Sequence, residues 1–512
     1  MQSTLSEQEI IRRESLEKLR ELGIDPYPAA LYPVSHLATD IKSQYKDGAE
    51  GFEEVCLAGR LMMRRIMGKA SFAELLDSSG RIQLYVSRDD ICPDDDKTMY
   101  NTVFKKLLDT GDFIGVKGFV FTTKVGETTL HVKELTVLSK SIKPLPIVKT
   151  RVDEETGQQV TYDAFTDPEL RYRQRYLDLV VNPAVKEHFT TRTMVIKEMR
   201  KFFDERGWME VETPILQPVH GGAAARPFAT HHNTLDMQLF MRIANELYLK
   251  RLIVGGYDGV YEIGKMFRNE GMDRTHNPEF TAMEIYVAYK DYIWMMEMVE
   301  QLINAISKQV TGGEEIEVGG DNISLTLPFR RLPMLEGIEE YAGVNIEGMD
   351  ADALRQVCRD LAIDVDPKHG KGKLIDAIFA AKVEPHLLQP TYITDYPIEL
   401  SPLAKKHRSK EGLVERYELF INRQEIANAY SELNDPIDQR ARFEDQLKLA
   451  AQGDDEAMAM DLDFVRALEY GMPPTSGLGI GIDRLVMLLT NQTSIQEVIF
   501  FPQMKKETGL GS

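Results

Sequence analysis

The segment from Val260 to Tyr286 carries residue types that could bind a flat, charged ligand. Two short runs of alternating apolar residues flank a polar loop that opens on Phe267-Arg268-Asn269-Glu270, which predicts an antiparallel hairpin with a long loop. Strand side chains alternate between the faces of a sheet. One face of the second strand would then offer a ring, a carboxylate and a hydroxyl, from Phe280, Ala282, Glu284 and Tyr286. The other face is apolar and predicts the core side, with Thr281, Met283, Ile285 and Val287.

A glycine-rich segment near the C-terminus offers a second ligand surface. One face of this predicted strand carries no side chains, because the alternating residues are Gly477, Gly479 and Gly481. A flat ligand could lie against such bare backbone. A helix is predicted to begin near Asp483, so Arg484 lies in its first turn, where a helix N-terminus and a guanidinium together favour an anion. The spacing does not fit a dinucleotide-binding loop, because Ile482 stands where that loop requires its third glycine.

The segment before the hairpin predicts a helix, a turn and an edge strand. Residues 194–203 have helical spacing, and Gly207 suits the turn that ends such a helix. Residues 208–211 then read as a strand that stops at Thr213-Pro214. Proline cannot donate a hydrogen bond to a neighbouring strand, so the edge of a sheet is its natural place.

Residues 53–145 predict a small barrel of about five short strands, of which the OB-fold is one candidate. Basic residues occur there around Phe72, Gln83 and Tyr85, namely Arg60, Arg64, Arg65, Lys69 and Arg81. Cations for phosphate, rings for stacking and an amide for base edges suit single-stranded nucleic acid. Taken alone, the pattern is more typical of a solvated strand face with one core phenylalanine.

The composition is that of a large intracellular enzyme. At 512 residues the chain has room for roughly two to four domains. Its three cysteines are far apart and odd in number, so they predict neither a disulfide framework nor a zinc site. There is no apolar run of membrane-spanning length and no signal-peptide core, so we expect no membrane partner and a cytoplasmic location. The net charge of -20 argues against a general nucleic-acid binder but allows a local basic surface.

Three segments in the right order resemble the motifs of class II aminoacyl-tRNA synthetases. Residues 201–217 are similar to motif 1, residues 260–286 to motif 2 and residues 476–489 to motif 3. The string GRLMMRRIMGKASFAELLDSSGRIQLY is similar to the anticodon-binding OB-fold of the subclass for lysine, aspartate and asparagine. That resemblance implies that the anticodon bases meet Arg65, Phe72, Gln83 and Glu134. Motif 1 implies a homodimer.

The remaining charged residues of the predicted site favour a cationic amino acid. Arg268 suits the substrate carboxylate, and the groups left over are mostly acidic. Glu246 opens a predicted helix, and Glu284 lies on the ligand face of the hairpin. The spacing i, i+3, i+7 would align three further residues on one face of a helix, namely Glu425, Asn428 and Glu432. A buried ammonium needs a paired carboxylate, so this set favours lysine.

Nearly the whole chain resembles the bacterial-type class II lysyl-tRNA synthetase family, in strings such as GGAAARPFATHHN, FRNEGMDRTHNPEFT and ELFINRQEIANAYSELNDP. The resemblance implies that L-lysine is bound by Gly222, Glu246, Arg268, Glu284, Tyr286, Asn428 and Glu432. It implies that ATP is bound by Arg268, Glu270, His276, Phe280 and Arg484, of which Arg268 and Arg484 are catalytic. Glu418 and Glu425 would bind Mg²⁺, with more than one ion per subunit, and tRNA(Lys) would be the third substrate.

The predicted fold class is α+β, with an OB-fold barrel followed by a class II catalytic domain on an antiparallel sheet. The predicted domains are a helical extension at 1–52, the barrel at 53–145, a linker at 146–185 and the catalytic domain at 186–512. The helix at 6–22 of the extension suits either packing or tRNA contact, and residues 330–390 predict helices without chemistry. Arg274 departs from the family pattern, because it stands two residues before His276, so the resemblance does not assign it the γ-phosphate contact of an arginine directly before the histidine.

Rival interpretations differ in features that the chain carries. An aspartyl or asparaginyl synthetase shares the architecture but needs a less acidic pocket. A paralogue that transfers lysine to a protein would lack the barrel, and this chain has one. A non-catalytic RNA-binding or regulatory relative would be expected to lose Arg268, Arg484 or the metal carboxylates, and the sequence keeps them.

Overall fold

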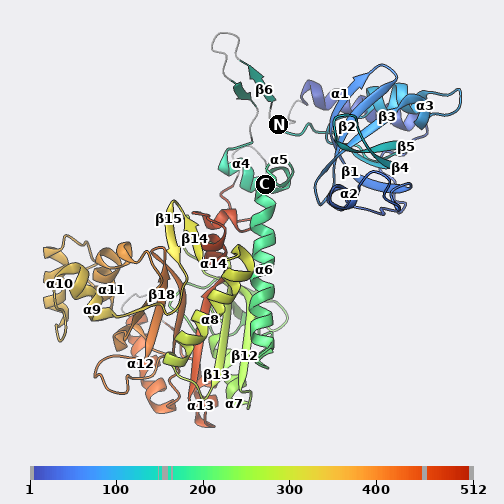
Figure 1. Cartoon of the computed structure of the whole chain (residues 1–512). Helices are drawn as coiled ribbons and strands as arrows, with labels where there is room; N and C mark the ends of the chain where they lie inside the picture. The colour runs from blue at the N-terminus through green and yellow to red at the C-terminus, as the bar shows by residue number, and fades with distance from the viewer. Residues whose placement is uncertain (1–4, 148, 153–158, 163–164, 452–457, 507–512) are drawn as a thin grey trace. The chain divides into compact units, whose positions relative to one another are not determined.

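The computed structural model describes residues 5–147, 149–152, 159–162, 165–451 and 458–506. It divides into two compact units, Met1–Phe165 and Thr166–Ser512. The boundary falls within the predicted linker at 146–185. Each unit can be followed by colour in Figure 1.

The N-terminal unit is built on a closed five-stranded barrel, as predicted. The strand order around it is β1-β2-β3-β5-β4, and β3 and β5 are parallel while the other pairs are antiparallel. The bounds are β1 Val55–Met67, β2 Ala70–Leu76, β3 Arg81–Ser87, β4 Phe113–Thr122 and β5 Thr128–Ser139. Alternate residues such as Leu75, Leu84 and Val132 fill the interior. Gly68, Gly111 and Gly126, which lie between barrel elements, all have positive φ.

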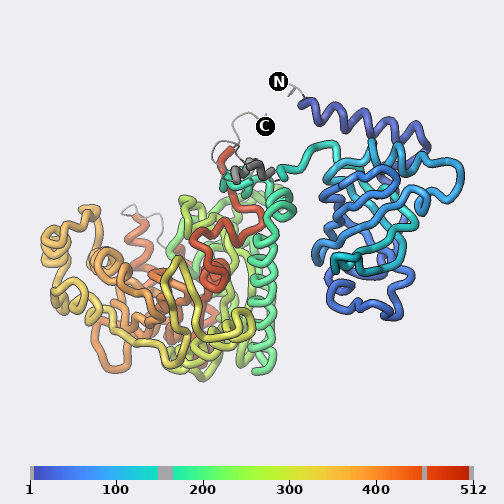
Figure 2. Tube along the Cα trace, turned by 45° about the horizontal axis from the view of Figure 1, so that its top comes forward, coloured from blue at the N-terminus to red at the C-terminus, as the bar shows by residue number. Residues whose placement is uncertain are grey.

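Helices close the barrel unit. Helix α1, Glu7–Glu21, lies beside the barrel strands in Figure 2 and begins at a capping box between Ser6 and Glu9. Its Leu19 belongs to the barrel core, so the helix packs against the barrel. Helix α2, Ala38–Gln44, adds Ile41 to the same core. The segment between β3 and β4 holds α3, Arg88–Ile91, and a π-helix η1, Met99–Leu107, which the strand pattern did not predict. The short strands β6, Lys149–Val152, and β7, Gln159–Tyr162, pair with each other.

The C-terminal unit is built on an eight-stranded sheet in the order β16-β17-β18-β19-β20-β13-β12-β8. The central pairs are antiparallel, as predicted, and only the outer pairs β16–β17 and β12–β8 are parallel. The first strands along the chain are β8 Met209–Glu210, β12 Gly259–Phe267, β13 Glu279–Ala288 and β16 Arg330–Pro333. The later ones are β17 Thr391–Thr394, β18 Arg416–Ile421, β19 Gln424–Ser431 and β20 Thr475–Gly481. The strand that was predicted to end before Thr213-Pro214 is β8, and it lies at the edge of the sheet.

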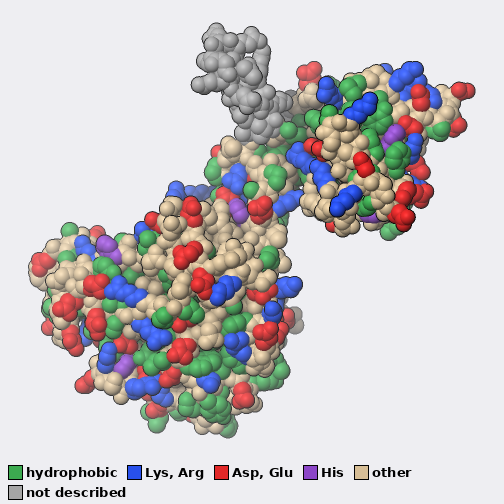
Figure 3. All heavy atoms as spheres, viewed as in Figure 1, with side chains coloured by type: hydrophobic (Ala, Val, Ile, Leu, Met, Phe, Trp, Pro, Cys, Tyr) green, Lys and Arg blue, Asp and Glu red, His purple; other side chains and the backbone are tan. Residues whose placement is uncertain are grey.

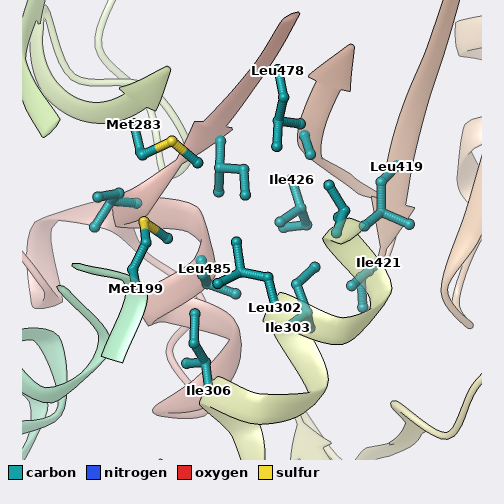
Figure 4. Close-up of a cluster of buried hydrophobic side chains, with 14 of the residues drawn as sticks. Met199, Met283, Leu302, Ile303, Ile306, Leu419, Ile421, Ile426, Leu478 and Leu485 are labelled. Carbon is teal, nitrogen blue, oxygen red and sulfur yellow. The ribbon is translucent and has the colours of Figure 1, made fainter. Parts of the chain in front are cut away.

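One face of this sheet carries the main core (Figure 4). Helices α6 Ala184–Asp204, α8 Tyr292–Thr311 and α14 Ile482–Leu489 contribute Met199, Leu302 and Leu485 to it. The predicted apolar face of β13 is confirmed, because Met283, Ile285 and Val287 belong to this cluster. Tyr286 and Ala288, on the opposite face of β13, belong to a second cluster with Leu249 and Phe464.

Further elements frame the sheet. The helices are α4 Pro168–Arg173, α5 Arg175–Val181, α7 Glu246–Val254, α9 Met334–Ala342, α10 Ala351–Asp360, α11 Lys371–Lys382, α12 Pro436–Ala451 and α13 Leu462–Glu469. Short 3-10 helices are η2 Glu384–His386, η3 Ile398–Leu400 and η4 Ile495–Glu497. Small sheets are formed by β9 Leu216–Gln217, β10 Ala229–His232 and β11 Met237–Met241, and by β14 Glu315–Val318 with β15 Asp321–Ser324. Helices α9 to α11 enclose a separate core, which confirms that residues 330–390 are largely helical.

Acidic and basic side chains are interspersed over the face of the C-terminal unit that Figure 3 shows, so that face carries no continuous patch of one sign. Within the part of the chain that the structure describes, no helix is both long and apolar enough to span a membrane.

Candidate active site and nucleic-acid interface

The floor of the candidate site is the pair β13–β20. Glu284 lies opposite Gly479 and Tyr286 lies opposite Gly477, so acidic and aromatic side chains stand beside bare backbone. A Cβ added at Gly477 would lie 2.1 Å from Glu432 Oε1 and 2.4 Å from the Tyr286 ring. A Cβ at Gly479 would instead meet Glu284 at an ordinary 3.8 Å. The glycine face is therefore used in two ways: Gly477 makes room for protein side chains, and Gly479 leaves open surface.

Three buried carboxylates meet above this floor. Glu246, at the start of α7, is 4% exposed, Glu284 is 9% exposed, and Glu432, just after β19, is 1% exposed. The hydroxyl of Tyr286 donates to Glu284 Oε2 at 3.0 Å, and the hydroxyl of Tyr430 donates to Glu246 Oε1 at 2.6 Å. The three acids that the sequence assigned to the lysine pocket are therefore gathered here.

Gly222 borders the same pocket. Its φ of +89° lies in the left-handed region that favours glycine. A Cβ there would lie 3.2 Å from the Glu246 Cβ, so the Gly222 backbone passes next to the Glu246 side chain. The structure thus brings together these two residues, which are far apart in the sequence.

The burial of the pocket acids favours a cationic ligand. Burial, and then the neighbouring Glu246, raises the pKa of Glu284 to about 7. Burial raises the pKa of Glu432 well above its usual range, although the nearby Lys250 opposes that shift. A buried carboxylate with a raised pKa gains most from a positively charged ligand, because that ligand offsets the cost of burial.

Sequence reasoning missed Lys250. Its side chain is fully buried and forms ion pairs with both Glu246 and Glu432. Burial lowers its pKa, but the two carboxylates outweigh that effect and raise the pKa overall. A lysine four residues after a glutamate on a helix is usually an exposed pair, so the spacing alone gave no sign of a buried one.

Arg268 presents a half-buried guanidinium beside the pocket. Its Nε is buried and makes no hydrogen bond, and no ion pair of Arg268 occurs among the described residues. Burial lowers its pKa, while Glu425, Glu270 and Glu284 oppose that shift. Its Cζ lies 5.1 Å from the centre of the Phe280 ring. An unsatisfied guanidinium at the end of a ligand floor suits a carboxylate or phosphate oxygen.

The long loop of the β12–β13 hairpin approaches the start of α14. Arg484 Nη2 donates to His276 Nε2 at 3.1 Å, while Asp273 lies 2.9 Å from the other ring nitrogen of His276. Arg484 Nη1 also donates to the backbone oxygen of Glu425 at 2.9 Å. Two residues predicted to bind ATP, His276 and Arg484, are thus in contact. Glu270 is exposed at the start of the loop, and Arg274 is exposed with its carbonyl accepting from Ile495.

The predicted helix through Glu425, Asn428 and Glu432 is wrong. The segment is strand β19, in which residues three apart ordinarily face opposite sides. The register with β18 shifts: Glu425 lies opposite Phe420 and Ala427 opposite Leu419, which leaves Ile426 as an extra residue. Ile426 and Ala427 both belong to the core. This β-bulge shifts the alternation by one, so Glu425 shares the site side of the sheet with Asn428 after all.

The predicted metal pair lies on β18 and β19. Glu418 accepts from the Tyr396 hydroxyl at 2.8 Å, from Asn428 Nδ2 at 3.2 Å and from Arg416 Nη2 at 2.5 Å. Burial, and next the charge of Glu425, raises the pKa of Glu418 to about 7. Two carboxylates that repel each other in this way suit a divalent cation between them.

The residues present fit Mg²⁺. The described residues contain no group of three acidic, histidine or cysteine side chains arranged for a metal ion. Mg²⁺ does not need one, because it commonly binds one or two protein carboxylates and completes its shell with water and substrate phosphates. Arg416, which sequence reasoning missed, holds both Glu418 and Asn428 in place through its hydrogen bonds.

The outer surface of the barrel carries a row of side chains that crosses all five strands. Strand pairing places Arg65 opposite Phe72, Phe72 opposite Tyr85, Tyr85 opposite His131 and His131 opposite Phe119. Successive rings lie 5.4, 4.9 and 4.6 Å apart between centres. Cations and half-exposed rings in one row suit single-stranded nucleic acid. His131 and Phe119 were missed, because their alignment with Phe72 depends on the barrel's closure.

The other two predicted anticodon residues flank this row. Gln83 lies on β3 two residues before Tyr85, and its Oε1 accepts from Thr129 at 2.8 Å. Glu134 is exposed on β5, three residues after His131, and lies 3.6 Å from the Lys117 ammonium. Arg65, Phe72 and Gln83 thus form one patch, and Glu134 lies farther along β5.

Comparison with known proteins matches both units. Residues 167–505 match the family of class II tRNA synthetases (D, K and N), and residues 55–138 match an OB-fold nucleic acid binding domain. A lysine–tRNA ligase of Porphyromonas gingivalis (strain ATCC 33277) is 62% identical over 504 residues, which are 98% of this chain and 86% of that protein. The chain belongs to the lysine–tRNA ligase family of class II tRNA synthetases.

Two other relatives agree. The lysine–tRNA ligase of Christiangramia forsetii is 61% identical over 98% of this chain and 87% of its own length. That of Azobacteroides pseudotrichonymphae is 58% identical over 98% of this chain and 99% of its own length. The synthetase match spans the whole eight-stranded sheet, and the OB-fold match covers the five barrel strands except the last residue of β5.

Proposed function

We propose that the chain is a lysine–tRNA ligase that joins L-lysine to tRNA(Lys) at the expense of ATP. The lysine carboxylate attacks the α-phosphorus in line, its new O–P bond forms, the bond to the bridging oxygen breaks, and pyrophosphate leaves. The 3′-hydroxyl of the terminal adenosine of tRNA then attacks the acyl carbon of lysyl-adenylate. The acyl C–O bond to phosphate breaks, AMP leaves, and the hydroxyl proton passes to phosphate or solvent.

The choice of lysine rests on one observation, the buried acidic pocket of Glu246, Glu284 and Glu432. An aspartate or asparagine pocket needs a free cation or a neutral donor for the substrate side chain. Of the two cations of this pocket, Lys250 is already paired with two of the acids, and Arg268 is assigned to the α-carboxylate of the substrate. A substrate with two ammonium groups satisfies the remaining negative charge.

The pocket residues divide between the ends of the substrate. Gly222 and Glu246 hold the α-amino group, and Arg268 with Asn428 holds the carboxylate. The ε-ammonium lies among Glu284, Tyr286 and Glu432. The unsatisfied Nε of Arg268 supports the carboxylate assignment, because a buried donor without a partner gains from an anionic ligand.

The ATP residues act by position and charge rather than by covalent chemistry. Phe280 stacks on adenine with Glu270 at its edge, and His276 and Arg484 contact the triphosphate. Arg268 stabilises the charge that develops at the α-phosphate. Glu418 and Glu425 hold Mg²⁺, which when bound neutralises phosphate charge and orients the phosphate oxygens. The contact between His276 and Arg484 supports their joint role.

The barrel binds the anticodon through Arg65, Phe72, Gln83 and Glu134. Support comes from the half-exposed position of Phe72 next to the exposed Arg65 and near Gln83 on the barrel surface.

We also propose that the enzyme is a homodimer that works in the cytoplasm. The edge strand β8 and the segment after it expose large apolar side chains, namely Met209, Ile215 and Leu216. Such an edge needs a covering partner.

Amino-acid-dependent ATP–pyrophosphate exchange tests the proposal. The twenty amino acids are assayed singly, with Mg²⁺ and without tRNA, and exchange with lysine alone is expected. Exchange with aspartate or asparagine instead would keep the fold and overturn the role of the acidic pocket. Absence of exchange with every amino acid would identify a paralogue that uses the site for another purpose. Sedimentation of the same preparation tests the dimer.

A further inference from the structure

We propose that Lys250 is a positioning residue for lysine recognition: its buried ammonium separates Glu246 and Glu432 and sets the charge of the pocket so that it accepts two substrate ammonium groups. The inference rests on the proposed function. It assigns a role to a residue that contacts pocket acids on two separate elements, the start of α7 and the end of β19.

The surroundings of Lys250 show that its ammonium is held from several sides. Its side chain is fully buried, and its Nζ pairs with Glu246 Oε1 and Glu432 Oε2. It lies 5.5 Å from the centre of the Tyr430 ring and 5.9 Å from that of Tyr286. Tyr430 also donates its hydroxyl to the same Glu246 oxygen. Movement of Lys250 would therefore release both carboxylates and disturb the ring that supports one of them.

A purely structural ion pair is the simpler interpretation. Lys250 is on α7, which also sends Leu247, Leu249 and Ile253 into a core cluster, and its ammonium lies 5.7 Å from the Phe464 ring of α13. Buried ion pairs can often be replaced by apolar side chains without loss of stability. Both partners of Lys250 are, however, pocket acids, and Glu432 Oε1 also lies against the bare Gly477. Its role therefore concerns the pocket rather than the core alone.

Charge balance supports this role. The loaded pocket contains four negative groups: Glu246, Glu284, Glu432 and the substrate carboxylate. It contains four positive groups: Lys250, Arg268 and the two ammonium groups of lysine. Buried charges persist only when they are compensated, so the count explains why an internal lysine is needed beside three acids for a substrate with two ammonium groups.

The consequence of removing Lys250 follows from the geometry. Without its ammonium, Glu246 and Glu432 repel each other in a buried space, and one of them takes up a proton. A protonated carboxyl no longer offers full charge to the substrate. The affinity for lysine should therefore fall, while the affinity for ATP should not. This loss of lysine affinity should become smaller as the pH rises and the proton is removed.

The test compares Lys250→Met with a matched control, Lys140→Met. Lys140 is also fully buried and pairs with two carboxylates, Asp109 and Asp112, but it lies in the barrel unit. Pyrophosphate exchange is measured against lysine, ATP and pH, alongside thermal unfolding. Lys250→Met should raise the lysine KM about 30-fold or more at pH 7, while the ATP KM changes less than about 3-fold. Its lysine KM should fall towards the wild-type value as pH increases.

Three results would overturn the inference: an unchanged lysine KM, a lysine KM that shows no added pH dependence, or lysine and ATP KM values that rise together. Lys140→Met should keep the wild-type lysine KM whatever stability it loses. Should Lys250→Met fail to fold, Lys250→Gln is measured in the same assays. It should show the same selective and pH-dependent rise of the lysine KM, and a wild-type lysine KM in a folded Lys250→Gln would overturn the inference. Failure of wild-type exchange with lysine would instead reject the proposed function.

Discussion

Arg268 is the residue on which the proposed chemistry of the site depends most directly. Its guanidinium is half-buried and has an unsatisfied Nε, so a ligand oxygen completes its hydrogen bonding. Arg268→Ala should lower kcat/KM for pyrophosphate exchange by about 10²- to 10³-fold, because preorganised charge near the reacting phosphate is lost. Arg423→Ala, at an exposed turn between β18 and β19, should stay within about 2-fold of wild type. Circular dichroism checks that both variants fold; near-normal exchange by Arg268→Ala would reject its role.

The titration of Glu284 predicts how lysine binding depends on pH. Its pKa is raised to about 7, so its carboxyl is largely neutral near pH 6 and largely charged near pH 8. Only the charged form pairs fully with an ammonium, so the lysine KM should fall as the pH rises through about 7. Glu284→Gln should raise the lysine KM and remove this part of the pH profile. An unchanged slope in Glu284→Gln would assign the titration to another group.

The strand face on which a site residue lies could be predicted from the sequence where side chains alternate regularly. Phe280, Glu284 and Tyr286 were placed on one strand face because strand side chains repeat every second residue, and the pairing of β13 with β20 agrees. Lys250 and Arg416 could not be recognised in this way. Both are basic residues whose partners come from separate strands or helices, so their burial depends on tertiary packing that local spacing does not encode.

At the level of the elements, the hairpin, the glycine strand and the helix after it were predicted from local patterns. Strand β19 was not, because its residues Glu425 and Asn428, together with Glu432 just after it, fit a helical repeat equally well. The bulge at Ile426 is the physical reason: it interrupts the two-residue alternation by which a strand would be recognised. The grouping of the acids was right, but a shifted strand rather than a helix produces it.

Alanine substitutions at Gly477 and Gly479 can be compared directly, because the two glycines of β20 have different surroundings. In Gly477→Ala the new methyl group would collide with Glu432 and Tyr286, so these side chains must move. Small displacements of binding groups cost large factors in rate, and the lysine kcat/KM should fall roughly 100-fold. Gly479→Ala has ordinary contacts and should leave the fold unchanged. Equal lysine kinetics in Gly477→Ala and wild type would show that Glu432 does not set the pocket.

On the scale of the whole molecule, the chain divides chemistry from RNA recognition. The residues proposed to bind lysine and ATP all lie in Thr166–Ser512, and the predicted anticodon residues all lie in Met1–Phe165. This division was predictable from composition and motifs, because each unit has its own core and its own pattern. The boundary at residue 165 was harder to predict, because a charged linker gives no single point of division.

A substitution on the barrel surface should change tRNA binding without changing pyrophosphate exchange in the C-terminal unit. Phe72→Ala removes the ring that neighbours Tyr85 on the barrel surface, and loss of one base-stacking ring typically costs about 1–3 kcal/mol. The affinity for tRNA should fall about 10- to 100-fold, while tRNA-independent pyrophosphate exchange stays unchanged. Filter binding and aminoacylation measure the first effect. Equal loss in both steps would remove Phe72 from the anticodon interface.

The ion pairs of Lys250 also limit how such an enzyme can evolve. A lineage that drifts toward a neutral amino acid must first give up an acid of the pocket. Loss of Glu246 or Glu432 leaves the ammonium of Lys250 without one of its partners, and an incompletely compensated buried charge costs about 3–5 kcal/mol. A protein with only that one substitution should therefore be less stable than one in which Lys250 is replaced as well. A change of amino-acid preference thus favours replacement of Lys250 together with one of its acids.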